Sequence, residues 1–411
     1  RFHPHSSSKG LSARPYGKLS DILGRKRMLL TTAALFIVGT AMCALATSVE
    51  MLIAGRAVLG IAVGMGSCIS PVYISELAEE QHRGKLVNLF VVAIQSGIFI
   101  SFVTGYLFSS GGEWRVMIGL GIVPAIILYG YALLLPESPR WLVIHGYEAR
   151  ARNILANLYG NAKADAEVKN IRKIAEEEKV EIALLLQPGF IKVILVGIAI
   201  SFFTQTIGIN AINYYAPTIF QTTGFSSPTI ATFATMFIGL VLTLSTISSL
   251  FFIDKIGRRK PLLFGMLGIL FCLLFISATF SLLHDPMIIA RSMFIGSVLF
   301  MIFHGISIGP ACFLIPSEIF PAKIRGLAMG VAVAFNWSAN VLVAFLFPIG
   351  LTHFGVGACF AIFFAVSIIG WIIFYFSVPE TKGLTLEHIE RSITTNVKMR
   401  HLGVEVRCQN D

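Results

Sequence analysis

The sequence DKIGRRK at residues 254–260 forms a short charged loop between two long apolar runs. A close copy, DILGRKR, occupies residues 21–27. Both stretches place an acid three residues before a glycine, and an arginine and a further cation directly after it. One repeated motif of this kind is weak evidence for duplication. Further repeats along the chain are needed to show that a whole unit is duplicated.

Two further motifs recur in the same order in both halves of the chain. A serine–glutamate pair precedes an arginine–glycine pair at one fixed spacing, and a proline–glutamate pair closes each set. The first copies are Ser75-Glu76 with Arg83-Gly84, and Pro136-Glu137; the second are Ser317-Glu318 with Arg325-Gly326, and Pro379-Glu380. Three ordered repeats in one apolar chain indicate a duplicated unit, which is typical of transporters built from two halves.

Composition identifies a membrane protein. The mean hydropathy is +0.78, and 55% of the residues are hydrophobic while 13% are charged, values outside the range of soluble proteins. Ten runs are long enough to cross a bilayer as helices. They are residues 28–47, 51–74, 86–108, 116–135, 190–220, 230–253, 261–283, 287–316, 327–349 and 355–378. The expected fold is therefore an all-α membrane protein with two pseudo-symmetric bundles.

The positive charge follows the topology of these runs. Of the 32 lysines and arginines, Arg115 alone falls in the loops of one side, and Arg56, Lys192 and Arg291 fall within runs. All the others lie on the opposite side, which we therefore assign to the cytosol together with both termini. The net charge of +10 is thus a signal of orientation in a plasma or bacterial inner membrane. It does not indicate a partner nucleic acid.

The repeat also predicts the domain organisation. Residues 1–142 form an N-terminal bundle, 143–189 a cytosolic helical linker, 190–380 a C-terminal six-helix bundle, and 381–411 a cytosolic tail. Two runs precede the charged loop at 254–260, whereas only a polar segment precedes its copy. By symmetry, we expect that the first half lacks two helices and that a complete chain would have twelve.

Polar side chains within the apolar runs are the candidate binding residues. Run 190–220 contains Gln205, Asn210, Asn213 and Tyr214 around Gly208, and such groups are costly in lipid unless they line a cavity. Gly208 and Pro217 are expected to break this helix, as in discontinuous helices at substrate sites. Outside this run, Gln95 is the amide in the middle of run 86–108, and Asn336 and Asn340 share one helix face.

Arg56 lies about 8 Å along its run, where a cation normally needs an acidic partner. No acid lies within the ten runs, so we expect its partner on a missing helix, with snorkelling to the interface as the alternative. We find no nucleophile–base pair, phosphate loop or metal-ligand cluster. An enzyme, a cofactor and a metal site are therefore not expected.

At these motifs the chain resembles the sugar porter family of the major facilitator superfamily, over residues 17–390. The resemblance implies twelve helices in two bundles and a monosaccharide bound between them. It also implies that the amides Gln95, Gln205, Asn210, Asn336 and Asn340 contact sugar hydroxyls, and that Phe313 and Trp337 flank the sugar. The family usually has a second glutamine at Thr204 and a tryptophan at Phe313, so the resemblance does not identify glucose as the substrate.

The charged loops suggest a gating network. We expect pairs between Asp21 and Arg25, Glu76 and Arg83, Asp254 and Arg258, and Glu318 and Arg325, with Glu137, Arg140 and Glu380 of the closing motifs beside them. Our hypothesis is that these pairs hold the cytosolic ends together while the site faces outward. The alternative is that the cations serve topology alone, but this does not explain the matched acids.

Transport of a hexose or pentose by alternating access is the function that these features favour, and proton coupling is left open. A membrane receptor that senses sugar without transporting it is one alternative. An inactive remnant of a transporter is another, because two helices are expected to be missing.

Overall fold

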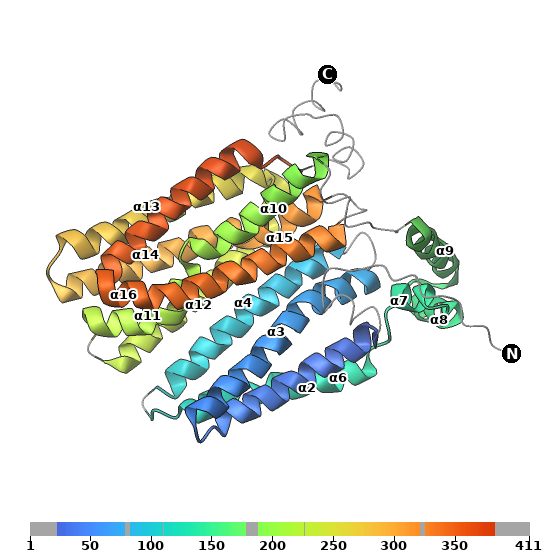
Figure 1. Cartoon of the computed structure of the whole chain (residues 1–411), viewed down its shortest axis with the longest axis horizontal. Helices are drawn as coiled ribbons and strands as arrows, with labels where there is room; N and C mark the ends of the chain where they lie inside the picture. Colours follow the sequence, from blue (N-terminus) through green and yellow to red (C-terminus); the bar gives the residue numbers. More distant parts are fainter. Residues whose placement is uncertain are drawn as a thin grey trace. The chain divides into compact units, whose positions relative to one another are not determined.

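Helices account for the regular secondary structure in the part of the chain that the computed structural model describes (Figure 1). That part comprises residues 23–78, 83–109, 111–177, 188–225, 227–320 and 325–382. The residues fall into two compact units. The first unit contains the described residues up to Phe90 and those from Glu113 to the end of the linker helices. The second unit contains the described residues of 91–112 and those from Pro188 onward. Helix α4 (Arg83–Leu107) therefore contributes to both.

Nine segments of the described chain are long and apolar enough to cross a bilayer. The last one, α16, breaks at Gly355, where φ is 78° and ψ is 172°, so it contains two helices. The ten predicted crossings are thus confirmed. The segments are α2 (Arg25–Ala44), α3 (Val49–Leu77), α4, α5 (Trp114–Gly119) with α6 (Ile122–Leu134), α10 (Pro188–Thr206) with α11 (Ile209–Thr223), α12 (Pro228–Ile256), α13 (Arg259–Leu282), α14 (Pro286–Ile306) with α15 (Ile308–Ile319), and α16 (Arg325–Ser377).

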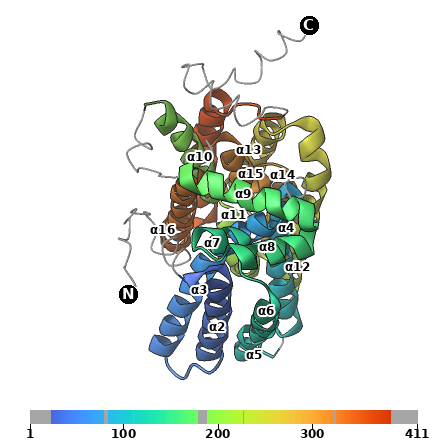
Figure 2. The ribbon, with the colours of Figure 1, turned by 90° about the vertical axis from the view of Figure 1, so that its right-hand side faces the viewer.

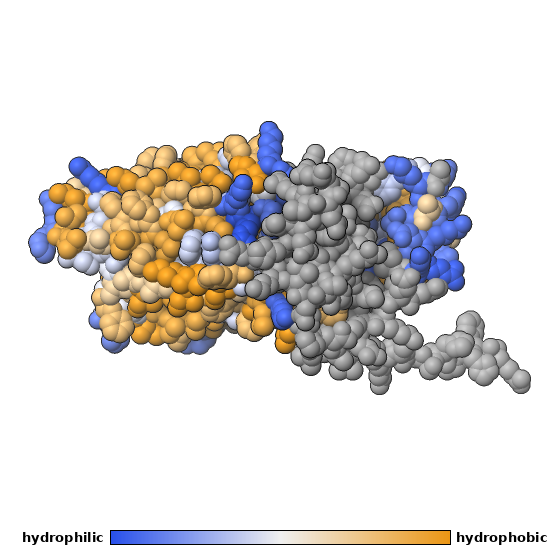
Figure 3. All heavy atoms as spheres, turned by 90° about the horizontal axis from the view of Figure 1, so that it is seen from above, coloured by the Kyte–Doolittle hydropathy of each residue, from blue (hydrophilic) through white to orange (hydrophobic). Residues whose placement is uncertain are grey.

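The outward faces of these helices carry large apolar side chains. On α13, Phe264, Leu267, Phe271 and Leu274 recur at helical spacing and are 44–71% exposed. Figure 3 shows apolar side chains over much of the visible face and hydrophilic ones toward its ends. In water such a surface would favour aggregation, but in a bilayer it faces hydrocarbon. The exposed face therefore suits contact with lipid.

In the first unit, α2 packs against α3 and α6 (Figures 1 and 2). Their shared core includes Met28, Met65, Ile69 and Ala132. The chain then continues into the linker helices α7 (Pro139–Ile144), α8 (Glu148–Tyr159) and α9 (Asn161–Glu177). The hydroxyl of Tyr159 donates a hydrogen bond to the carbonyl of Leu77, and so ties α8 to the end of α3.

In the second unit, α10 packs mainly against α16, and the break between α10 and α11 lies at Gly208. Gly208 has φ of +96°, and a Cβ on it would lie 2.8 Å from Cδ2 of Phe363. The predicted break is confirmed here and is wrong at Pro217, which lies inside α11. A proline removes one backbone donor, and α11 continues past that single loss.

Replacing Gly208 by alanine should destabilise the second unit. The left-handed backbone and the contact with Phe363 together cost about 2–4 kcal/mol, so thermal unfolding should shift down by roughly 5 °C or more. Gly130→Ala on α6 is the matched control, because nothing lies within 4 Å of its added Cβ. Equal melting temperatures for the two variants would contradict this account of the break.

Candidate functional site

Amide side chains from α10, α11 and α16 form one hydrogen-bonded cluster in the second unit. Gln205 is its centre: Nε2 donates to Oδ1 of Asn336 at 3.1 Å, and Oε1 accepts from Nδ2 of Asn340 at 3.4 Å. The Nδ2 of Asn210 also donates to Oε1 of Gln205. The break at Gly208 separates the two residues, so Asn210 lies in the first turn of a new helix, α11, while Gln205 lies in the last turn of α10. Three helices are thereby joined by one glutamine.

The cluster has a buried end and an exposed end. At the buried end, Asn336 is 7% exposed, and its Nδ2 donates to the backbone carbonyl of Ser201 at 2.9 Å. At the other end, Nδ2 of Asn340 reaches the hydroxyl of Tyr214 at 3.5 Å, and Tyr214 is 52% exposed. The cluster therefore runs from the packed interior of the unit to an open surface.

Two further predicted residues present buried carbonyl oxygens that are not paired. Oε1 of Gln95 and Oδ1 of Asn213 have no hydrogen-bond partner among the described residues. The backbone of Gln95 is held in place, because its carbonyl accepts from Oγ1 of Thr243 at 3.1 Å. Leaving a buried acceptor without a partner costs about 1–3 kcal/mol. These two oxygens are therefore buried acceptors that a hydrogen-bond donor would stabilise.

The two predicted aromatic residues lie on neighbouring elements. Phe313 is half-buried on α15, and Trp337, which directly follows Asn336 on α16, is 39% exposed.

The hydroxyl of Thr204 donates a hydrogen bond to the carbonyl of Ile200 at 2.6 Å, so this donor is already used within α10. The sequence could not show this use, since a threonine beside a glutamine is equally compatible with a hydroxyl aimed at a ligand.

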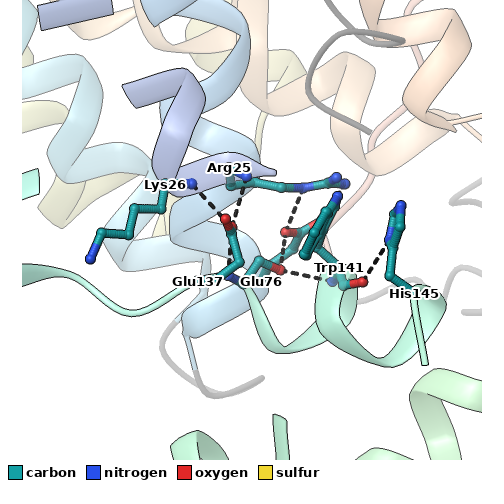
Figure 4. Close-up of polar contacts among 7 residues, drawn as sticks. Arg25, Lys26, Glu76, Glu137, Trp141 and His145 are labelled. Atoms are coloured by element: carbon teal, nitrogen blue, oxygen red, sulfur yellow. Dashed lines mark hydrogen bonds and ion pairs between the residues drawn. The ribbon is translucent and has the colours of Figure 1, made fainter. Parts of the chain in front are cut away.

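A second polar constellation stands at the start of α2 in the first unit (Figure 4). The Nε and terminal nitrogens of Arg25 each lie 3.0 Å from an oxygen of Glu76, and Ser138 donates its hydroxyl to the same carboxylate. Oε1 of Glu137 accepts from the backbone N–H groups of Arg25 at 2.7 Å and Lys26 at 3.0 Å. Glu137 therefore satisfies two open donors at the positive end of α2.

The second unit repeats these contacts at the start of α13. A terminal nitrogen of Arg258 lies 2.9 Å from Oε1 of Glu318, and the Thr381 hydroxyl donates to that carboxylate. Glu380 accepts from the backbone N–H groups of Arg258 at 2.9 Å and Arg259 at 3.2 Å. The three repeated sequence motifs are thus one repeated structure, which we call the latch. Its hydroxyl residues, Ser138 and Thr381, were missed, although each directly follows the motif glutamate.

Glycine is required in each latch at the position before the arginine. Gly24 has φ of +90°, and a Cβ added to it would overlap the carboxylate of Glu137. Gly257 has φ of +97°, and a Cβ added to it would overlap the carboxylate of Glu380. The close approach of carboxylate to backbone explains why the charged loops contain this glycine.

The latch pairs differ from those that the sequence suggested. Arg25 and Arg258 bind the glutamates of the neighbouring motif, because the helix ends that carry the motifs meet in space. Asp21 and the side chains of Arg83, Asp254 and Arg325 lie outside the described residues, so the four pairs as predicted stay predictions. Arg140 is half-buried at the start of α7, and Arg56 is exposed on α3.

Comparison with known proteins agrees with this architecture. The family described as "Sugar (and other) transporter" matches residues 12–393. The arabinose-proton symporter of Escherichia coli is 35% identical over 94% of this chain and 83% of that protein. The probable metabolite transport protein CsbC of Bacillus subtilis is 34% identical over 93% of this chain and 83% of that protein.

Solved structures give the same result. The proton:xylose symporter XylE bound to 6-bromo-6-deoxy-D-glucose superposes with a TM-score of 0.77 at 31% identity, over 92% of this chain and 85% of that one. The fold therefore belongs to the major facilitator superfamily. With its repeated latches, its amide cluster and a match along almost its whole length, this chain belongs to the sugar transporter family.

Proposed function

We propose that this protein carries a monosaccharide, a hexose or a pentose, across the membrane by alternating access and in symport with protons. The observation that carries the proposal is the amide cluster around Gln205, which offers hydrogen-bonding groups without charge inside a membrane-spanning unit. Relatives that are one third identical are arabinose-proton and galactose-proton symporters, and one solved relative is a proton:xylose symporter.

The chemistry of the cluster suits a sugar. Each sugar hydroxyl both donates and accepts, and each amide offers both roles without the desolvation penalty of a charge. The unpaired carbonyl oxygens of Gln95 and Asn213 would gain partners from bound hydroxyls. Apolar sugar faces would rest on Phe313, Trp337 and Tyr214. A site of this kind rejects an analogue that lacks one hydroxyl, since its own polar groups then stay unpaired.

Orientation and coupling complete the proposal. The basic loops, both latches and the linker helices face the cytosol, in a plasma or bacterial inner membrane. Arg56 is the coupling candidate, because a cation exposed on a membrane-spanning helix calls for an acidic partner that can titrate. The latches regulate opening toward the cytosol.

The direct test is uptake by the full chain in proteoliposomes. Labelled arabinose, xylose, galactose and glucose are supplied with and without an inward proton gradient, and L-glucose serves as the stereochemical control. At least one D-sugar or L-arabinose should enter saturably, and the gradient should drive accumulation that a protonophore collapses. Binding of a sugar without any flux would favour a sensor instead, and absence of both binding and flux would overturn the proposal.

A further inference from the structure

His304 lies in the last turn of α14 and is 4% exposed. Neither of its ring nitrogens has a hydrogen-bond partner among the described residues. Its ring stacks on Phe300, with an angle of 14° between the ring planes. An imidazole has one donor and one acceptor even when neutral, so leaving both unused in a buried position is costly. The mechanism proposed above gives this residue no role.

The ring stands at a junction between two half-helices. Helix α14 ends at Ile306, and α15 begins at Ile308 after Ser307, whose φ of −118° and ψ of −92° are not helical. A Cβ on Gly309 would lie 3.1 Å from Cε1 and 3.2 Å from Nδ1 of His304. The ring is therefore packed against the first turn of α15. Movement of that turn away from α14 would remove this contact with the ring.

The α14 side of the junction is firmly held. At Gly305 an added Cβ would meet the backbone of α12, 3.0 Å from the nitrogen of Thr246. At Gly265 of α13 an added Cβ would overlap Ser307, the residue between α14 and α15, so the junction itself is also closely packed. Beyond the junction, α15 carries Phe313, four residues after Gly309, and Glu318 of the second latch. Displacement of α15 would thus change the proposed sugar site and the latch together.

Among the described side chains of the helices that pack on α14, no charged group lies near the ring. The helices that pack on α14 are α11, α12, α13 and α15. The charged residues of these helices lie at the helix ends: Lys255 of α12, Arg259 and Lys260 of α13, and Glu318 of α15. Measured along the helix axis, Arg291 of α14 and Glu318 are each about 20 Å from His304. The other titratable groups of these helices are tyrosines and cysteines, and the side chain of Asp254 lies outside the described residues. An imidazolium in this position would have neither an acceptor nor a counter-charge, so this arrangement requires the neutral ring.

We propose that His304 is a proton-binding site whose protonation releases the first turn of α15 from α14. The proton adds to the free ring nitrogen, and the resulting cation is stable only where water reaches it. Protonation therefore favours the arrangement in which α15 has moved, by linkage between proton binding and conformation. Its effect on sugar transport rests on the proposed function, whereas the movement of α15 itself does not.

Hydrogen exchange of the α15 amides tests the inference on the full chain in lipid nanodiscs without sugar. A water-exposed histidine titrates near pH 6.5, so acidification from about pH 7.5 to about pH 5.5 should populate the open arrangement about tenfold more. Wild type and variants are compared at the same pH, which cancels the intrinsic chemistry of exchange. The variants are His304→Phe, which keeps the stack on Phe300, and His304→Gln.

Loss of the tenfold change in both variants supports the proposal. His353→Phe is the matched control: this histidine is exposed on α16 and bonded to the carbonyl of Ile349, so its loss should leave the change intact. An unaltered pH response in either folded His304 variant, or no pH response in wild type, overturns the proposal. Sugar exchange in proteoliposomes with equal pH on both sides is the second readout. Sugar transport that fails at every pH while the exchange result stands would overturn the proposed function alone.

Discussion

The variant Gln205→Ala is expected to lose sugar affinity by between about fivefold and about 100-fold, and to lose some thermal stability as well. The substitution removes the partner of three amides at once, those of Asn210, Asn336 and Asn340. One buried polar group left unpaired costs about 1–3 kcal/mol, and 1.4 kcal/mol corresponds to about tenfold in affinity. The released amides would also lose the geometry that aligns them with sugar hydroxyls.

The measurement is the apparent KM and the equilibrium Kd of the transported sugar in proteoliposomes. Gln221→Ala provides the matched control, since Gln221 is an exposed amide near the end of the same helix that carries Asn210. It should leave both constants unchanged. An unchanged Kd in Gln205→Ala would mean that the amide cluster only holds helices together, as interhelical amides in membranes often do.

Neutralising the second latch, as Arg258→Gln or Glu318→Gln, should lower the transport rate by about tenfold. Removing one partner of a fully buried ion pair costs about 3–5 kcal/mol. The two side chains here are 13% and 24% exposed, and after a discount for screening about 1–2 kcal/mol remains. The latch joins α13, α15 and the residues that follow α16. Since we propose that these ends face the cytosol, the loss should favour arrangements that are open to the cytosol.

The readout combines transport rate with the accessibility of single cysteines placed in the loops of each side. Arg258→Lys should not rescue the rate, because an ammonium cannot reproduce the fork of contacts that a guanidinium makes. Arg152→Gln is the control. Arg152 holds the pKa of Asp165 below its ordinary value, but both side chains are about half exposed, so the pair should contribute little. Normal rates and accessibility in both latch variants would leave the cations a role in topology alone.

The sequence was sufficient for the architecture. Long apolar runs, the repeated charged loops and the bias of lysine and arginine each reflect a strong local preference, and together they predicted ten crossings and a duplicated unit. The residues of the amide cluster could also be selected, because an amide in the middle of an apolar run is conspicuous. The break at Gly208 could be predicted because a glycine among polar residues is unusual within an apolar run.

Partners across the fold were harder to predict. Arg25 and Glu76 are far apart in sequence, and only the packing of α2 against α3 shows that they pair. Ser138 and Thr381 are ordinary hydroxyl residues until their carboxylate partners are located. The hydroxyl of Thr204 is turned back onto its own helix, which depends on one rotamer. That the ring nitrogens of His304 have no hydrogen-bond partner among the described residues could not be predicted either, because it follows from the packing of four other helices.

The contact of Glu137 with the backbone beside Gly24, and of Glu380 with that beside Gly257, has an evolutionary consequence. With φ of +90° at position 24 and +97° at position 257, a side chain larger than hydrogen is strained whatever space surrounds it, and the facing carboxylate must also move aside. A change of the facing acid alone therefore cannot open either position to another residue, because the backbone strain remains. Random mutagenesis of one such couple, scored by growth on the sugar, should recover the glycine–glutamate combination almost exclusively, and independently in the two halves.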